Sequence, residues 1–271
     1  MWETIIVQPF TNILLVINTL TGGNFGIAII LFTILIRLVT HPLMASQIKG
    51  STKMQEMQNS KEWQEIQKKY KDDKEKLAQE QMKYYKDIGY NPLSACIPSL
   101  IQLPLILGLY QSITRANAAA PLQLITLTRT VYSFFDTFFH LRLAAMVPLN
   151  SQFLWMNLGQ PERIYAFGLA IPSLAIIVAI TTYIQAKITM PAATNPNDQS
   201  AMMGSMMTLY MPLMLAYFAY TYASGLAVYF IVGNVIGIAQ YALLGKVNWS
   251  ALLPGKKPAQ KPAPVPAKRK K

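Results

Sequence analysis

Long apolar runs, separated by polar segments, are the main feature of the chain. Five of them have a length of roughly 20 residues, which a helix needs to cross the hydrocarbon core of a bilayer. None shows period-2 alternation, and backbone groups in lipid must be hydrogen-bonded within their own segment, so we predict helices rather than strands. The predicted membrane-spanning helices are 24–43, 92–115, 164–188, 206–222 and 226–245. The fold class that follows is an all-α membrane protein.

Residues 1–23 carry a different pattern. Apolar side chains such as Trp2, Phe10 and Leu14 recur at helical spacing, with polar side chains such as Asn12 and Asn18 between them. This pattern is typical of an amphipathic helix that lies in the membrane interface. A cleaved signal peptide is the alternative, but the basic residues at its start are missing here. We therefore predict an interfacial helix.

Residues 44–91 hold 18 of the 36 charged side chains, as ten lysines and eight acidic residues. Apolar residues lie among them at roughly helical spacing. The stretch KYKDDKEK offers a turn, with Asp72 or Asp73 as the N-cap of a second helix. The segment is therefore predicted to be a charged helical hairpin.

The distribution of Lys and Arg sets the orientation. No basic residue precedes the first span, and ten lysines follow it. By the positive-inside rule the N-terminus lies outside, and 44–91, the loop 189–205 and the tail 246–271 lie in the cytosol. Nineteen basic residues then lie inside and four outside. The outer loop 116–163 has no pattern that predicts its fold.

Composition agrees with a membrane protein. Charged residues make up 13% of the chain, against about 25% in ordinary globular proteins. The net charge is +12, and the segment 246–271 supplies eight basic residues and no acid. Such a Pro/Ala/Lys-rich tail cannot bury enough apolar surface to fold alone, and its expected partners are anionic, either lipid headgroups or RNA.

Arg37 interrupts the first span and is the most informative residue. A charge at the centre of a spanning helix costs about 2.5–3.5 kcal/mol, so the side chain needs water, a partner or a path to the headgroups. Snorkelling to the headgroups explains Arg37 alone, and helix-to-helix hydrogen bonding explains any single polar group. Several polar groups together indicate a wet cavity that opens to the cytosol. The polar residues of the spans on which this argument rests are Thr33, Arg37, Thr40, Gln102, Gln185, Asn234 and Gln240.

Enzyme chemistry finds little support in the residues. His41 and His140 are isolated, Cys96 is the only cysteine, and no metal-ligand spacing, phosphate-binding glycine loop or nucleophile motif is present. We expect no enzymatic activity, no cofactor and no metal. Gly233 and Gly237 form a G-x-x-x-G pair, which favours close helix packing.

Four sequence blocks resemble the YidC/Oxa/Albino family of membrane protein insertases, in its short form without a large periplasmic domain. They are TILIRLVTHPLMASQ, NPLSACIPSLIQLPLILGLYQSI, ITTYIQAKI and SGLAVYFIVGNVIGIAQY. The resemblance implies five helices around a hydrophilic groove that is open to cytosol and lipid, with Arg37 as its single arginine. It further implies that Thr33, Gln185, Tyr229 and Phe230 line this groove or contact substrate. The loop 116–163 is longer than the family pattern leads us to expect.

The function implied by the resemblance is insertion of proteins into the bacterial plasma (inner) membrane. Hydrophilic tails of nascent membrane proteins would pass through the groove, and the hydrophobic segments would enter the lipid bilayer. The ribosome, targeting factors and the general secretion translocon are the further partners that we expect. The basic residues expected to hold the ribosome, or another anionic partner, are Lys256, Lys257, Lys261, Lys268, Arg269, Lys270 and Lys271.

Two other functions compete with this hypothesis. A small-molecule or anion transporter would use Arg37 as its binding site, but transporters usually contain internal repeats with paired broken helices, and the sequence shows no such symmetry. A chaperone that only assists helix packing, without a translocation step, is the other alternative.

Overall fold

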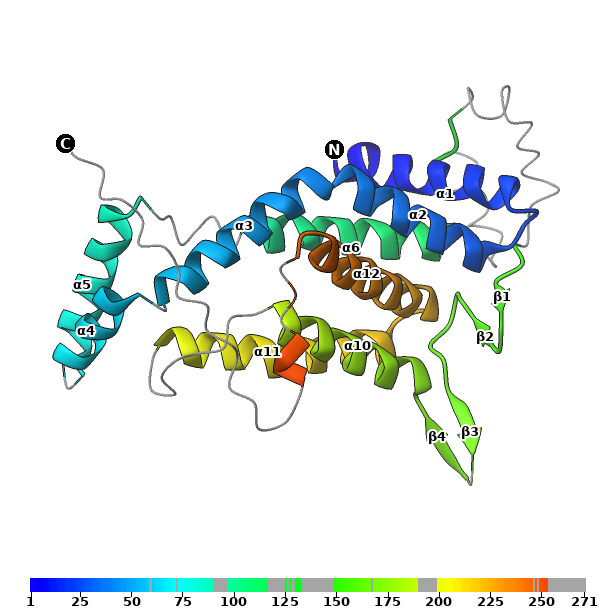
Figure 1. The fold of residues 1–271 in the computed structure, drawn as a ribbon. Helices are drawn as coiled ribbons and strands as arrows, with labels where there is room; N and C mark the ends of the chain where they lie inside the picture. The colour runs from blue at the N-terminus through cyan, green and yellow to red at the C-terminus, as the bar shows by residue number, and fades with distance from the viewer. Residues whose placement is uncertain are drawn as a thin grey trace. The chain divides into compact units, whose positions relative to one another are not determined.

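The computed structural model describes residues 1–58, 60–71, 73–89, 97–116, 125, 127, 130–132, 149–166, 168–189, 199–245, 247 and 249–252. These residues are mostly helical (Figure 1). The helices are η1 (Glu3–Val7), α1 (Gln8–Leu20), α2 (Phe25–Val39), α3 (His41–Gln58), α4 (Lys61–Lys69), α5 (Lys74–Asp87), α6 (Ile97–Ala116), α10 (Ser173–Thr189), α11 (Gln199–Thr221), α12 (Ser224–Leu243) and η3 (Trp249–Leu252). The strands are β1 (Gln152–Phe153), β2 (Met156–Asn157), β3 (Ile164–Ala166) and β4 (Leu169–Ile171).

The chain forms two compact units. Unit 1 comprises Met1–Thr40, Ile101–Tyr183 and Met211–Gly237. Unit 2 comprises His41–Leu100, Ile184–Tyr210 and Ile238–Lys271.

A cluster of buried apolar side chains holds unit 1 together, and it draws on six helices, with Ala219 as the buried member from α11. Its helical members come from the first half of α2, α10 and α12 and from the second half of α6, with α1 packed on them. Representative members are Leu14, Leu15, Phe25, Ala28, Ile29, Phe32, Leu109, Ile113, Leu174, Val178 and Leu226. Phe10 of α1 meets Phe32 of α2 edge to face, with ring centroids 5.2 Å apart. We call this part of unit 1 the apolar end.

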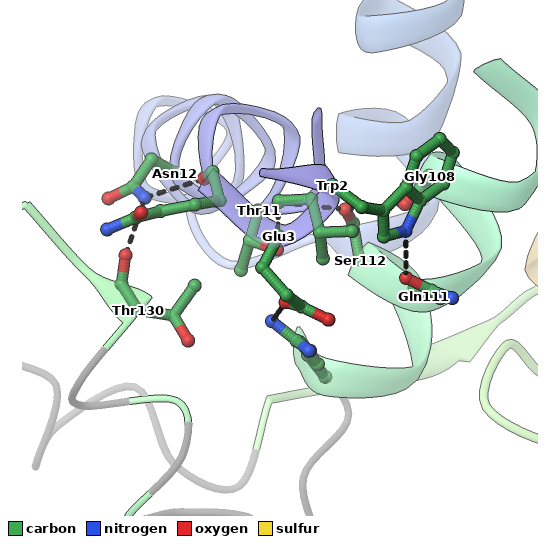
Figure 2. Close-up of polar contacts among 11 residues, drawn as sticks. Trp2, Glu3, Thr11, Asn12, Gly108, Gln111, Ser112 and Thr130 are labelled. Atoms are coloured by element: carbon green, nitrogen blue, oxygen red, sulfur yellow. Dashed lines mark hydrogen bonds and ion pairs between the residues drawn. The ribbon is translucent and has the colours of Figure 1, made fainter. Parts of the chain in front are cut away.

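The N-terminal helix is fastened to α6 by polar contacts (Figure 2). Trp2 donates a hydrogen bond from Nε1 to Oε1 of Gln111 at 2.8 Å, and Glu3 forms an ion pair with Arg115 at 2.5 Å. Ser112 donates to the carbonyl oxygen of Val7 at 3.2 Å. These contacts hold the π-helical turn η1 and the residue before it against α6.

The polar side chains of α1 do not all face water, contrary to the amphipathic pattern predicted for 1–23. Thr11, Asn12 and Asn18 are buried. The Asn12 side chain donates to the carbonyl oxygen of Thr130 and accepts from the amide of Tyr132, both at 2.9 Å, so it pairs with that segment as a backbone would. Asn12 thus fits a water-facing stripe in the sequence but is satisfied by a distant part of the chain, while Thr11 donates to the Val7 carbonyl oxygen of its own helical segment.

The predicted third span, 164–188, is wrong over its first eight residues. Ile164 pairs with Ile171 in an antiparallel hairpin of β3 and β4, and α10 begins only at Ser173. Gly168, with φ of +77°, provides a left-handed position next to the turn. Pro172, which has no amide hydrogen to donate, stands directly before the helix. Because the residues around Gly168 and Pro172 are apolar, the sequence pattern there resembles that of one continuous helix.

Other helices also have bounds that differ from those of the predicted spans. The first helix ends at Val39 rather than residue 43, and α11 begins at Gln199, seven residues before the predicted start. Within the described residues, Glu3–Leu20 and Ser224–Leu243 are long and apolar enough to cross a membrane, and Phe25–Val39 with His41–Gly50 gives a third if the pair forms one broken span. The helix Ser173–Thr189 is apolar but shorter. Five spans and their orientation stay predictions, as does the interfacial place of 1–23.

In unit 2, α4 and α5 form the predicted charged hairpin. Asp73 is the N-cap of α5, as predicted, and accepts a hydrogen bond from the Lys76 amide at 3.1 Å. Trp63 of α4 is fully buried, and its ring centroid lies 5.9 Å from that of Tyr84 and 5.4 Å from that of Tyr85. The hairpin therefore has an aromatic core of its own beneath a charged surface.

Candidate functional site

Arg37 lies in the last turn of α2, and its guanidinium group rests against Gly233 of α12. A Cβ atom added to Gly233 would lie 2.8 Å from Nη2 of Arg37. The arginine is partly buried, and among the residues that the structure describes it has no ion pair and no side-chain hydrogen bond. A cation in this position keeps its capacity to bind an anion, because no carboxylate of the described chain neutralises it.

Tyr229 connects this arginine to a third helix. It precedes Gly233 by one turn on the same face of α12, is buried, and interacts electrostatically with Arg37. Gln102, near the start of α6, donates from Nε2 to the Tyr229 hydroxyl at 2.7 Å. Side chains from α2, α6 and α12 therefore meet at one polar position.

Asn234 extends the polar position toward α10. Its Nδ2 atom donates to Oγ1 of Thr181 at 3.0 Å and to Oγ1 of Thr182 at 2.8 Å. Both asparagine and Thr182 are buried. This is the arrangement by which an amide holds two membrane helices together, so Asn234 has a structural role besides any contact with substrate.

The two ends of unit 1 differ in chemistry. On α2, α10 and α12 the buried apolar residues come first and the polar ones later, while on α6 Gln102 precedes the apolar Leu109 and Ile113. Gly225 lies between Ile29 and Ile113, with a built Cβ 3.0 and 3.2 Å from their side chains, so the apolar end is tightly packed. We call the opposite region the polar end. It consists of Arg37, Gln102, Thr181, Thr182, Tyr229, Gly233 and Asn234, and Tyr229 is also the member of the apolar cluster at which the two ends meet.

The remaining predicted site residues fall into three groups. Thr33 is fully buried and donates to the carbonyl oxygen of Ile29 at 2.6 Å, and Phe230 is part of the apolar cluster. Gln185 belongs to unit 2 and is partly buried, so its place in a groove stays a prediction. The basic tail residues from Lys256 to Lys271 lie outside the described residues.

Sequence reasoning missed the role of Gly233. The G-x-x-x-G spacing predicted close packing of helices, whereas the space at Gly233 is filled by the guanidinium of Arg37. The spacing was a correct signal that something approaches the backbone of α12, but it does not distinguish a neighbouring helix from a single long side chain. The Thr181–Thr182 pair was also missed, because adjacent threonines are common in apolar helices.

Known proteins are similar to this chain over most of its length. The family described as "60Kd inner membrane protein" matches residues 16–250. The membrane protein insertase MisCA of Bacillus subtilis is 34% identical over 90% of this chain and 78% of its own length. The membrane protein insertase YidC 2 of Listeria innocua is 35% identical over 90% of this chain and 71% of its own length. The chain belongs to the YidC/Oxa family. The resemblance seen in the sequence is thus confirmed.

The fold agrees with a solved member of the family. A crystal structure of an active YidC insertase has a TM-score of 0.51 at 24% identity, covering 82% of this chain and 42% of that one. Membership of a family of inner membrane proteins, together with the apolar helices, makes this chain a bacterial inner membrane protein. The YidC family accounts for the helical fold of this chain.

Proposed function

We propose that this YidC family member is a membrane protein insertase, which moves hydrophilic tails of nascent proteins through a cytosol-open hydrophilic groove. Relatives that are 34–35% identical carry the name membrane protein insertase. The observation that carries the mechanism is the partly buried guanidinium of Arg37, which has no acidic partner within the described chain. The groove would contain the polar end of unit 1.

Arg37 would attract acidic tails. Two unit charges 4 Å apart interact by about 1 kcal/mol in water and about 4 kcal/mol at an effective dielectric constant near 20. A cation in a partly buried position therefore exerts a stronger pull than one in bulk water. The Tyr229 hydroxyl and the Gln102 amide beside it can exchange hydrogen bonds with the polar groups of a passing tail.

The apolar end would keep the groove closed on the outer side. Its packed side chains leave the polar end as the hydrated part, so the tail has a shorter apolar barrier to cross than the full bilayer. The hydrophobic segment that follows the tail then leaves sideways into lipid. Burial of apolar surface drives this step at about 25 cal/mol per Å². The mechanism needs no nucleotide.

The proposed topology has five spans, with the N-terminus outside and the C-terminus in the cytosol. The hairpin of α4 and α5 would receive substrate or targeting factors. The basic tail would hold the ribosome through RNA phosphates, with lipid headgroups as the alternative ligand. Cooperation with the general secretion translocon belongs to the same proposal.

Reconstituted vesicles test the role of Arg37. With a single-span substrate that has an acidic N-terminal tail, Arg37→Ala should slow insertion about tenfold, equivalent to ~1.4 kcal/mol of lost attraction. Arg37→Lys should keep most of the activity because it retains the charge. Arg163→Ala, which removes an exposed cation from the other end of unit 1, is the matched control and should insert normally.

A second substrate separates attraction from structural damage. Replacing the tail's Asp and Glu by Asn and Gln should remove most of the difference between Arg37→Ala and the parent protein. Equal insertion of the acidic substrate by Arg37→Ala and the parent protein would contradict the attraction mechanism. Equal slowing of both substrates would indicate that Arg37 supports the fold instead.

An unpaired Arg37 also suits an anion transporter, which is the second candidate. Flux of radiolabelled phosphate or chloride into the same vesicles distinguishes the two functions. An insertase should show no flux above that of protein-free vesicles, whereas a transporter should show flux that Arg37→Ala abolishes.

A further inference from the structure

Two short hairpins stand directly before α10, and both present apolar side chains at their surface. The β1–β2 hairpin turns at Leu154 and Trp155, which are 73% and 55% exposed. In the β3–β4 hairpin, Tyr165 and Leu169 are 77% and 68% exposed. We call these four residues the hairpin tips.

The β3–β4 hairpin lacks the pattern of a strand pair in water. Its six strand residues, IYA and LAI, are all apolar or aromatic. A water-facing hairpin with one buried face would alternate apolar and polar residues. Here neither face is polar, and neither packs into the apolar cluster.

Leu154 gives a second indication that the hairpins lack the pattern expected in water. It has a φ of +54°, which is usual for Asn or Gly in a two-residue hairpin loop and strained for leucine. A leucine at that position exposes an apolar side chain where a polar residue would fit the backbone better.

Three contacts fix the segment between the tips to the helices. Phe153 lies against Gly26 of α2 so closely that a Cβ there would overlap its ring. The carbonyl oxygens of Asn157, Leu158 and Gln160 accept hydrogen bonds from Ser224 and Gly225 at the start of α12. The tips are therefore held on a rigid base rather than on a loose loop.

Glu162 is the third contact, and it joins both hairpins to α10. Its carboxylate is buried and accepts from the Ser173 hydroxyl at 2.8 Å and from the Leu174 amide at 3.1 Å. The Trp155 indole donates to the same carboxylate at 3.2 Å. The turn of the first hairpin is thereby tied to the first turn of a membrane helix.

We propose that the hairpin tips form a membrane anchor, whose ligand is the phospholipid headgroup layer on the side of the membrane where α10 begins. The helix α10 has 17 residues and spans only about 25 Å, less than the roughly 30 Å of a hydrocarbon core. The apolar hairpin at its start lengthens the apolar zone on that side. Tyr and Trp are the residues that membrane proteins place at this depth.

Backbone chemistry limits the depth. A two-stranded hairpin leaves unpaired amide and carbonyl groups on its outer edges, which hydrocarbon does not satisfy but the hydrated headgroup layer does. Arg163, directly before β3, is exposed and stacks over Tyr220 at 5.1 Å, which leaves a positive charge beside the lipid phosphates. The anchor is independent of the insertion mechanism, because it needs only that α10 is a membrane helix.

A fluorescent label measures the depth in the full-length protein. In a Cys96→Ser background, Leu169→Cys is labelled with the environment-sensitive dye NBD and reconstituted into phosphatidylcholine–phosphatidylglycerol vesicles. Lipids that carry a doxyl group near the headgroup should remove about half of the emission, as expected for an interfacial side chain. Asn150→Cys, at an exposed polar residue of the same segment, is the matched control and should be quenched by aqueous iodide instead.

A label at Leu169→Cys that is quenched by iodide and not by doxyl lipid would overturn the proposal. So would a label that becomes protected only when a membrane extract is added, since that would indicate a protein partner. If labelling at 169 disturbs folding, the label at Tyr165→Cys, on the other face of the hairpin, gives the same comparison. Stronger quenching by mid-chain than by headgroup doxyl lipids would also contradict an interfacial position.

Discussion

The guanidinium of Arg37 occupies the space that Gly233 leaves open on α12. A methyl group at Gly233 would lie 2.8 Å from Nη2 of Arg37, closer than a non-bonded carbon and nitrogen atom approach one another. Because Gly233 of α12 has no side chain, the guanidinium of Arg37 from α2 can occupy this place. Tyr229, one turn earlier, and Asn234, the next residue, bring α6 and α10 to the same position.

Gly233→Ala should move the guanidinium without unfolding the protein. The added methyl displaces the flexible end of Arg37, while alanine in a helix interior is favoured over glycine by about 0.5–1 kcal/mol. We therefore expect unchanged or slightly raised thermal stability together with insertion of acidic-tailed substrates that is slower by about threefold to tenfold, or ~0.7–1.4 kcal/mol. Gly233→Leu should slow insertion further.

Gly50→Ala on α3 is the control, because a Cβ there meets nothing within 4 Å. It should leave insertion unchanged. If Gly233→Ala inserts as fast as the parent while Arg37→Ala does not, the position of the guanidinium is less important than its charge.

Asn234→Ala should weaken the contact between α12 and α10 only modestly. Thr181 keeps its own hydrogen bond to the carbonyl oxygen of Ile177 at 2.8 Å, so the substitution does not leave that hydroxyl without an acceptor. Hydrogen bonds between membrane helices contribute about 0.6 kcal/mol on average and at most about 1.7 kcal/mol. We expect a loss of that size in the free energy of unfolding, measured by titration with sodium dodecyl sulfate.

A double-mutant cycle with Thr182→Val assigns the loss to this pair. The coupling energy should be at least about 0.5 kcal/mol for residues in direct contact. Additive losses would show that the two side chains do not depend on one another.

Much of the architecture could be predicted from the sequence, for identifiable reasons. Arg37 stands out because a charge in an apolar run is energetically costly, and the structure places Gly233 and Tyr229 of α12 beside it. Asp73 could be predicted as an N-cap because Asp is among the residues preferred directly before a helix.

The hairpins and the burial of α1 polar groups could not be predicted in the same way. The stretch from Ile164 to Ile171 is apolar throughout, so its hydrophobicity does not distinguish a strand pair from a helix. Asn12 looks water-facing in the sequence, because its partners Thr130 and Tyr132 are more than one hundred residues away. Long-range contacts of this kind leave no local pattern.

Glu162→Ala should destabilise the start of α10. The substitution removes the acceptor for the Leu174 amide and the Ser173 hydroxyl, and an unsatisfied buried donor costs about 1–3 kcal/mol. It also removes a negative charge from the N-terminus of a helix, where that charge is favourable. The free energy of unfolding in detergent should fall by ~1–3 kcal/mol.

Two variants serve as comparisons for Glu162→Ala. Glu162→Gln keeps one acceptor oxygen and should lose less than Glu162→Ala. Glu80→Ala removes a partly exposed carboxylate whose contact with Lys83 is 3.8 Å long, and should change stability by less than about 0.5 kcal/mol. A loss for Glu162→Ala no larger than for Glu80→Ala would show that the buried carboxylate is not needed by α10.

Acid should weaken the cap of α5. The hydrogen bond from the Lys76 amide, together with the Lys76 side chain at 3.0 Å, lowers the pKa of Asp73 below its usual range. A carboxylate with a depressed pKa in the folded state stabilises that state above the unfolded pKa of about 3.9, and its contribution is lost as the pH falls through the lower, folded-state pKa. The cap is therefore intact at neutral pH.

The ¹⁵N-labelled Lys76 amide reports this titration directly, because its chemical shift changes when the hydrogen bond that it donates to Asp73 is lost. We expect a midpoint below about 3.9. Asp73→Asn should retain the cap and show no titration, since asparagine caps helices as well as aspartate does, whereas Asp73→Ala should show a shifted resonance at every pH. A midpoint at or above the unfolded value would mean that the carboxylate gains nothing from the Lys76 amide, and that α5 begins at this residue for another reason.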